Sequence, residues 1–212
     1  MQDIKLIWIT PNTEQVISDC ARVSNPDNQG KDGTSLIKYL IKNKHWSPLE
    51  MASMCVEINT TRDIARQLLR HRSFSFQEFS QRYSTVEKLS SAPLREARLQ
   101  DSKNRQNSIK TNNVELQRWW EEEQQRIEYA ALYAYKEALS KGIAKEVARV
   151  LLPEGLTTSR LYMSGSIRSW FHFCEVRCGN GTQKETMDLA WGIRKILKDH
   201  CPNIEQALLE HS

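Results

Sequence analysis

The sequence lacks the features that mark several large classes of protein. Only 8 of its 212 residues are glycine, and no strand-like segment is followed by the glycine-rich loop of Rossmann-type enzymes. No apolar run approaches the roughly 18 residues that a membrane helix requires, and the apolar patch at residues 4–9 is too short for a signal peptide. The formal charge of +4 is far below that of a dedicated nucleic-acid binder. These absences favour a cytoplasmic protein that is expected to bind neither membrane nor nucleic acid.

The cysteines are few, odd in number and scattered. They are Cys20, Cys55, Cys174, Cys178 and Cys201. Only Cys174 and Cys178 lie close together, and no second pair of thiol or imidazole ligands stands at zinc spacing, so no metal site is predicted. In a cytoplasmic protein such cysteines are expected to be free thiols, and none is expected to be essential for chemistry.

The apolar pattern predicts one domain of mixed helices and strands over residues 1–212. Strands are expected at 4–9, 52–60 and 156–163, and helices after 12–13, 33–34 and 60–61, at 114–140, 145–152 and 166–177, and from 182 to just before Pro202. A chain of this length can bury one sizeable core. We therefore expect the α+β class, with a small central β-sheet flanked by several helices, one of them long.

Residues 86–112 interrupt this pattern. They are polar and have few apolar anchors. A structureless stretch of that length is uncommon inside a compact domain. We predict a loop insertion that is mobile or partly disordered, with low hydrogen-exchange protection in the ligand-free protein.

A dense polar cluster spans the second half of the helix expected after residues 60–61 and the segment that follows it. It contains Arg66, Gln67, Arg70, His71, Arg72, Glu78, Ser80, Gln81 and Arg82. The helix is expected to end in Arg70-His71-Arg72, so Gln67, Arg70 and His71 would share one of its faces. Guanidinium groups suit phosphates and planar carbonyl groups because they donate two parallel hydrogen bonds. A solvated basic helix end would have the same composition, and composition alone favours that interpretation.

The spacing of this cluster matches a known signature. Arg70-His71-Arg72, seven further residues and then Ser80 form the RHR-x7-S pattern of flavin-dependent thymidylate synthases. Other blocks resemble that family in the family's order: residues 21–24 (ARVS), 45–50 (HWSPLE), 146–153 (EVARVLLP) and 168–177 (RSWFHFCEVR). The resemblance implies the family's fold and its reaction. That reaction is the reductive methylation of dUMP to dTMP, with methylenetetrahydrofolate as carbon donor and FAD, reduced by NADPH, as hydride donor.

The resemblance also implies a role for each matching residue. FAD would be contacted by Ser24, His45, Arg70, His71, Arg72, Glu78, Ser166, Arg168 and His172. The nucleotide dUMP would be held by Gln67, Arg70, Glu78, Ser80, Gln81, Arg82, Arg149 and Arg177, several of them from a neighbouring subunit. Arg177 would be the catalytic residue, lying against the uracil ring and stabilising negative charge on it. Ser80, with no evident base beside it in the sequence, would position the substrate and not act as a nucleophile.

The long helix bears on the assembly. It carries Trp119-Trp120 beside Glu121-Glu122-Glu123, and one ring is expected in the core with the other at an interface. A small single domain would hardly bury both rings. Together with the resemblance, this predicts a homotetramer that shares its active sites between subunits.

Three positions depart from the family pattern. Ser166 and His172 stand where the family usually has asparagine, and no histidine stands near Gly181, where one is often present. The arginines expected to bind the nucleotide are retained. The leading alternative function is a non-catalytic nucleotide- or nucleic-acid-binding protein that uses the arginine cluster. A flavoprotein of another reaction is the third possibility.

Overall fold

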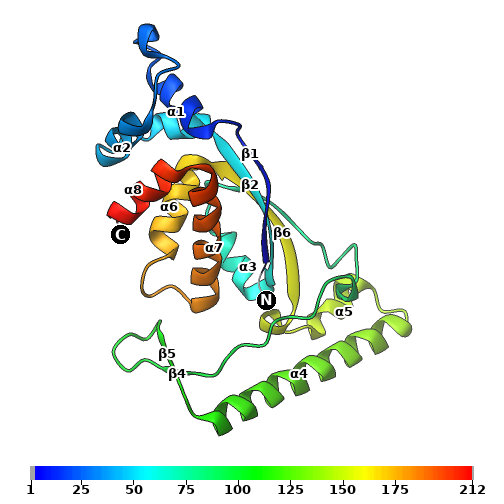
Figure 1. Ribbon diagram of the computed structural model, residues 1–212. Coiled ribbons are helices and arrows are strands. Elements are labelled where there is room, and N and C mark those ends of the chain that lie inside the picture. Colours follow the sequence, from blue (N-terminus) through cyan, green and yellow to red (C-terminus); the bar gives the residue numbers. More distant parts are fainter. Residues whose placement is uncertain (1–2, 212) are drawn as a thin grey trace. The chain divides into compact units, whose positions relative to one another are not determined.

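The computed structural model describes residues 3–211. The fold is of the predicted α+β class (Figure 1). Its contacts divide the chain into two compact units. The described part of unit 1 is Asp3 with residues 58–68 and 77–161, and that of unit 2 is residues 4–57, 69–76 and 162–211. Of the helices in residues 3–211, none combines the length and the apolar character needed to cross a membrane.

Four strands form the main sheet, in the order β1-β2-β6-β3. They are β1 (Asp3–Ile9), β2 (Ser53–Thr61), β3 (Ser75–Glu78) and β6 (Thr158–Ser166). The boundary between the two units crosses each of these strands. Side chains along the first half of β6 alternate between buried and more exposed positions, as expected for a strand with one covered face. The sequence predicted β1, β2 and β6, whereas β3 lies in a stretch without a clear pattern.

Unit 2 contains five helices with mutual apolar contacts. They are α1 (Thr13–Ala21), α2 (Thr34–Lys42), α6 (Ile167–Arg177), α7 (Lys184–His200) and α8 (Pro202–His211), with 3-10 turns η1 (Pro26–Asn28) and η2 (Ser47–Met51). Helices α6, α7 and α8 pack on one another (Figure 1) and bury Trp170, Ile193 and Leu208. The sequence did not predict α8, because the pattern before Pro202 predicts only the end of a helix there. Proline is also favoured at the first position of a helix, where no N–H donor is needed.

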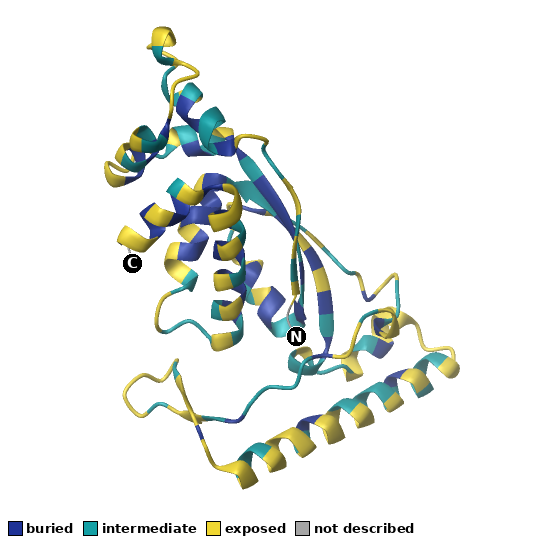
Figure 2. Ribbon diagram, in the orientation of Figure 1, coloured by how far each residue is buried: buried dark blue, intermediate teal, exposed yellow. Residues whose placement is uncertain are grey.

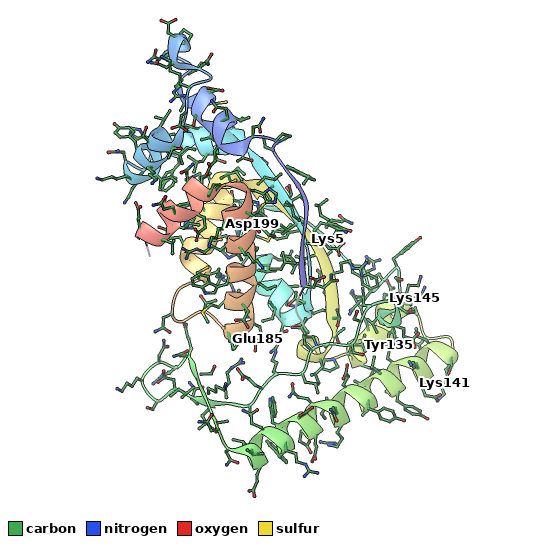
Figure 3. The ribbon with its side chains drawn as sticks, viewed as in Figure 1. Lys5, Tyr135, Lys141, Lys145, Glu185 and Asp199 are labelled. Carbon is green, nitrogen blue, oxygen red and sulfur yellow. The ribbon has the colours of Figure 1, made fainter. Side chains whose placement is uncertain are left out.

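Unit 1 is organised by the long helix α4 (Val114–Ser140), which agrees with the prediction at both ends. The Asn113 side chain accepts a hydrogen bond from the N–H of Leu116 at 3.0 Å, and Gly142 has a positive φ of 84° just beyond the helix. Most of α4 is exposed (Figure 2). The fully buried Tyr135 lies on the side of α4 toward α5, the helix that begins at Lys145 (Figure 3), and packs with Val86 and Ala148.

The other elements of unit 1 are short. They are α3 (Arg62–Leu68), α5 (Lys145–Ala148), β4 (Arg98–Gln100), β5 (Ser108–Lys110) and the 3-10 turns η3 (Val86–Lys88), η4 (Arg149–Leu151) and η5 (Glu154–Leu156). The helix predicted at 145–152 is therefore one α-helical turn followed by a 3-10 turn.

Helix α3 ends at Leu68, before the predicted end at Arg72. Arg70, His71 and Arg72 lie in the turn that leads to β3, where the N–H of Phe74 donates to the His71 carbonyl at 3.2 Å. The expectation that Gln67, Arg70 and His71 share a helix face was therefore wrong. Phe74 is instead buried just before β3, where its ring packs on Trp170.

The insertion at 86–112 has more structure than the sequence predicted. Strands β4 and β5 pair antiparallel, with Leu99 opposite Ile109. Just before this hairpin, the side-chain amide of Gln124 forms hydrogen bonds with the N–H and the carbonyl of Arg95, each at 2.9 Å. The side-chain amide of Gln117 does the same with the N–H and the carbonyl of Ala97, at 2.8 and 3.1 Å. The two glutamines lie two turns apart on α4, so they share a face. Their amides pair with the extended backbone as a neighbouring strand would.

Replacing Gln124 with leucine is expected to release this anchor. Gln124 is buried, so the change leaves the N–H and carbonyl of Arg95 without partners, at a cost of about 1–3 kcal/mol. Hydrogen exchange at Arg95 should then accelerate roughly tenfold or more, while the exposed amides of 98–110 exchange fast in both proteins. Gln100→Leu is the control, because Gln100 bonds only within the hairpin. Unchanged protection at Arg95, or strong protection throughout the hairpin, would contradict this picture.

Candidate functional site

His71 and Arg177 form the central polar contact of the site in unit 2. Arg177 is the last residue of α6, and its Nε donates to Nε2 of His71 at 2.9 Å. Burial, followed by the positive charge of Arg177, lowers the pKa of His71 to about 4. The imidazole is therefore neutral near pH 7, and the direction of the bond places its proton on Nδ1.

The region around His71 and Arg177 carries an excess of positive charge. Burial, followed by the charge of Arg70, lowers the pKa of Arg177, although a guanidinium stays ionised at neutral pH. Two neighbouring cations destabilise each other, and an anionic or electron-rich group placed between them would relieve that repulsion. The site is therefore electrostatically suited to an anionic ligand.

Aromatic side chains pack against the ring of His71 and fix its position. Its ring meets Phe173 edge-on, with centroids 4.9 Å apart, and Phe74 meets Trp170 in the same manner at 4.6 Å. Trp170 is in turn held by a hydrogen bond from its Nε1 to the Met54 carbonyl at 3.0 Å. Gly165 in β6 allows this packing, because a Cβ there would lie 2.5 Å from the Phe74 ring. The hydrogen-bonded pair of His71 and Arg177 is therefore held in place by packed aromatic side chains.

Arg168 lies at the other end of α6 and pairs with Glu50. Its Nη1 donates to Glu50 Oε1 at 2.9 Å. Burial acts to raise the pKa of the Glu50 carboxyl, but hydrogen bonds from Ser166 and Arg168 outweigh it and lower the pKa. Beside this pair is a cavity of about 440 Å³, lined by Lys44, Trp46, Ser73, Arg168, Ser169, Phe171, His172 and Glu175. His172 contacts Glu175 at 3.3 Å, and Trp46 packs on Phe171 with centroids 5.3 Å apart.

Comparison with known proteins decides the family. A family model described as thymidylate synthase complementing protein matches residues 5–203. The chain is 49% identical over 197 residues to a probable flavin-dependent thymidylate synthase of Paramecium bursaria Chlorella virus 1, covering 92% of this chain and 90% of the relative. It is 48% identical over 195 residues to the flavin-dependent thymidylate synthase of Synechocystis sp., covering 92% and 89%. The chain belongs to the flavin-dependent thymidylate synthase family.

Solved structures agree with this assignment. The chain resembles the UMP/dUMP methylase PolB from Streptomyces cacaoi bound with 5-Br UMP, with a TM-score of 0.88, 25% identity, and coverage of 100% of this chain and 95% of the other. The same methylase bound with 5-Br dUMP gives a TM-score of 0.87. The predicted family and fold class are therefore confirmed.

The residues matched to the family's signature are divided between the two units. Unit 2 holds Ser24, His45, Arg70, His71, Arg72, Ser166, Arg168, His172 and Arg177, and unit 1 holds Gln67, Glu78, Ser80, Gln81, Arg82 and Arg149. Within unit 2 the structure joins His71 to Arg177 and places Arg168 and His172 on one cavity. Ser24 is exposed after α1, and His45 packs edge-on against Tyr39 with centroids 5.9 Å apart.

Glu78 in unit 1 has two partners that the sequence did not reveal. Its Oε1 accepts from the Ser159 hydroxyl at 2.6 Å and from Arg62 Nη1 at 3.4 Å. Arg62 begins α3 and Ser159 lies on β6, so neither stands near Glu78 in the sequence. Glu50, the partner of Arg168, belongs to the matching block 45–50, but the sequence pattern does not indicate this contact. Residues that are this far apart in the sequence and meet only in the fold produce no periodic pattern in the sequence.

Gln81 and Arg82 differ in exposure although they are adjacent. Gln81 is buried, and in the described structure its Nε2 has no hydrogen-bond partner. An unpaired buried donor costs free energy, so a ligand carbonyl that reached it would be favoured. Arg82 is largely exposed and pairs with Glu146 at 3.3 Å. Ser80 is also exposed, and its carbonyl accepts the N–H of Tyr83 and of Ser84.

The donor set of unit 2 fits a flavin nucleotide. A flavin offers a flat ring with several nitrogen and oxygen acceptors and an anionic pyrophosphate, and unit 2 offers guanidinium donors, a neutral imidazole and an aromatic-lined cavity. Within residues 3–211 no cluster of three or more histidine, cysteine or acidic side chains is arranged to hold a metal ion.

Proposed function

We propose that this chain converts dUMP to dTMP, taking the one-carbon unit from methylenetetrahydrofolate and the hydride from FAD that NADPH has reduced. The observation that carries the proposal is the identity of 49% and 48% to two flavin-dependent thymidylate synthases across about nine tenths of the chain. The likeness to a methylase bound with 5-Br dUMP supports dUMP as the nucleotide. When bound, the flavin supplies the redox chemistry, and the protein supplies binding, orientation and electrostatics.

The flavin is held mainly by residues of unit 2. They are Ser24, His45, Arg70, His71, Arg72, Ser166, Arg168 and His172. The resemblance to the family adds Glu78 to the flavin-contacting set. The exposed guanidinium of Arg168, steadied by Glu50, is suited to the pyrophosphate. His45 lies near the flavin, where the folate must also approach. The side chains of Ser166 and His172 are the two that differ from the asparagines usual at these positions.

The nucleotide is held by Gln67, Arg70, Glu78, Ser80, Gln81, Arg82, Arg149 and Arg177, several of them reaching it from a neighbouring subunit. The buried Nε2 of Gln81 gains an acceptor when the nucleotide binds. The exposed pair of Arg82 and Glu146 is weak, so Arg82 can exchange its carboxylate partner for an anionic ligand at little cost. Ser80 positions the nucleotide and forms no covalent bond with it.

Arg177 activates the uracil ring. C5 must become electron-rich before it can attack the one-carbon donor, and a fixed cation beside N3 and the adjoining carbonyls stabilises the negative charge that this requires. Nε2 of His71 accepts a hydrogen bond from Nε of Arg177, and this bond fixes the guanidinium group. The two terminal nitrogens of Arg177 are then left to donate hydrogen bonds to the uracil ring. Because His71 is neutral, it holds this cation without adding a second charge.

The cofactor proposal is tested by colour. Purified protein mixed with FAD and desalted should keep the yellow flavin absorbance, and NADPH added without oxygen should bleach it. A colourless protein that takes up no FAD would instead support a nucleotide- or nucleic-acid-binding function for the arginine cluster. Retention of FAD with no effect of dUMP on its spectrum or turnover would indicate a flavoprotein of another reaction.

We also propose that the protein acts in the cytoplasm as a homotetramer with shared active sites. Both Trp119 and Trp120 are partly exposed, contrary to the expectation that one would be in the core. They line an apolar groove of unit 1 together with Ile127 and Leu156, and such a surface favours burial against another subunit. Sedimentation should give a tetramer that Trp119→Glu weakens. A fully active wild-type monomer would overturn the proposal.

A further inference from the structure

Two cysteines meet at the C-terminal end of α6. All five cysteines are free thiols, and Cys174 and Cys178 lie one helical turn apart. Cys178 is the C-cap residue, and its N–H donates to the Cys174 carbonyl at 2.9 Å. Cys174 is fully buried and its thiol approaches the Ala190 carbonyl at 3.9 Å, whereas Cys178 is partly accessible. One thiol can therefore meet a solute while the other is shielded from it.

A buried cation from α7 faces this thiol pair. Arg194 is 3% exposed, its Nε donates to Glu205 Oε1 at 3.0 Å, and its guanidinium lies 4.8 Å from the centre of the Trp191 ring. The buried Nη2 of Arg194 has no hydrogen-bond partner among the described residues. A buried guanidinium nitrogen without an acceptor is costly, and the Arg194 side chain interacts with the Cys178 thiol, so a thiolate at Cys178 would be stabilised there.

The charges around the pair make the two thiols unequal. The hydrogen bond from Cys174 and the positive charge of Arg194 lower the pKa of Cys178, although burial acts in the opposite direction. The hydrogen bond with Cys178, burial and the negative charge of Glu205 raise the pKa of Cys174, against the effect of Arg194. The accessible sulfur is therefore the one that ionises more easily, and the buried sulfur is the one that retains its proton more readily.

We propose that Cys178 reacts as a thiolate with hydrogen peroxide and that Cys174 then closes a disulfide with it. In the first step the Cys178 sulfur attacks one peroxide oxygen, an S–O bond forms, the O–O bond breaks and hydroxide leaves. In the second step the Cys174 sulfur attacks the sulfenic sulfur, and its proton leaves with the departing hydroxyl group as water. The peroxide is reduced and the two thiols are oxidised, so no other oxidant is needed.

This oxidation changes the helix end that carries Arg177. Side chains one turn apart have Cβ atoms about 5–6 Å apart, whereas a disulfide needs about 3.5–4.5 Å. The last turn of α6 must therefore tighten or unwind, and the turn after Cys178, in which Gly181 has a φ of 93°, can follow the change. Arg177 lies within that turn and holds His71. The effect on turnover rests on the proposed function, whereas the thiol chemistry does not.

The chemistry is tested first by labelling. Wild-type protein and Cys174→Ser are treated with hydrogen peroxide and dimedone, which traps sulfenic acids, and are analysed by mass spectrometry. Cys178 should be labelled at least about ten times faster than the exposed Cys20, which provides an internal control in the same chain. In wild type without dimedone, trypsin cleaves after Arg168, Arg177 and Lys184, so the disulfide should join peptides 169–177 and 178–184. Labelling of Cys178 no faster than Cys20, or absence of the joined peptides, would overturn the proposal.

The consequence is tested by turnover after peroxide is removed. Turnover of the oxidised wild-type protein should be at least about tenfold lower than that of the untreated protein. Dithiothreitol should restore it, since disulfides are reducible. Cys178→Ser should have normal turnover before treatment and keep it afterwards, and Cys20→Ser should respond as wild type does. If joined peptides form but turnover is unchanged, the coupling to Arg177 is wrong. A protein without any turnover from the start would refute the proposed function and leave the labelling result as the test of the thiol pair.

Discussion

Replacing Arg177 with alanine is expected to lower turnover of dUMP at least about a hundredfold, the scale on which loss of one preorganised donor acts. FAD should remain bound and reducible by NADPH, because Arg168 and the rest of the flavin-binding set are unchanged. The variant also removes the second contribution to the low pKa of His71, so that pKa should rise from about 4 toward its ordinary value. Turnover is measured as tritium released from 5-tritiated dUMP, and the histidine by NMR titration.

Two further variants separate ring activation from anchoring. Arg177→Lys should rescue poorly, because an ammonium group cannot donate to His71 and to the ring as a planar fork does. Arg149→Ala should raise KM for dUMP with a smaller loss of kcat, since this residue is proposed to anchor the nucleotide and not to activate it. Near-normal turnover in a folded Arg177→Ala protein would remove Arg177 from the mechanism.

Replacing Arg194 with methionine is expected to destabilise the fold by about 3–5 kcal/mol, because it leaves the Glu205 carboxylate buried without its partner. The side chains of Arg194 and Glu205 are only 3% and 12% exposed, so water can solvate neither of them fully. The measurement is the free energy of unfolding by urea. The double variant Arg194→Met with Glu205→Leu should recover most of the loss, since two apolar groups can replace a buried ion pair.

The exposed pair of Arg118 and Glu122 on α4 supplies the matched control. These side chains are 80% and 60% exposed and one turn apart, so Arg118→Met should change stability by less than about 1 kcal/mol. A loss at Arg194 as small as that at Arg118 would show that the buried pair does not stabilise unit 2.

Local sequence signals predicted much of the fold. Both ends of helix α4 agree with the prediction, in which Gly142 marks the stop, and the structure shows Asn113 as the cap of its first turn. The predicted start of α6 at Ser166 agrees with the structure to within one residue, since Ser166 is the N-cap and its hydroxyl accepts from the N–H of Ser169. Helix α8 was missed because Pro202 ends one helix and begins another, and the sequence alone does not decide between the two roles.

The failures have a common physical origin in contacts between distant parts of the chain. Helix α3 was predicted too long because nothing near Arg70 announces that Phe74 will be buried against Trp170. The insertion was predicted without regular structure because its anchors, Gln117 and Gln124, lie outside it on α4. The same limit applies to the site. Its arginines stand out in a sequence signature, whereas Arg62 and Ser159 are recognised only by what they contact.

The division of the matched residues between two units has a functional implication. Flavin-contacting candidates lie mainly in unit 2 and nucleotide-binding candidates mainly in unit 1. We expect the two ligand sets to respond separately to mutation, with Arg168→Ala weakening FAD and Arg149→Ala weakening dUMP. The single-domain expectation for residues 1–212 stays a prediction.

The central claim is that this chain replaces the C5 hydrogen of dUMP with a methyl group by flavin-dependent chemistry. The most direct measurement is release of tritium from 5-tritiated dUMP, with analysis of the nucleotide product, in reactions that contain or omit each of FAD, methylenetetrahydrofolate and NADPH. The account predicts tritium release and dTMP formation in the complete mixture, and dTMP formation only when all three are present. No tritium release and no dTMP from FAD-loaded protein in the complete mixture would contradict it.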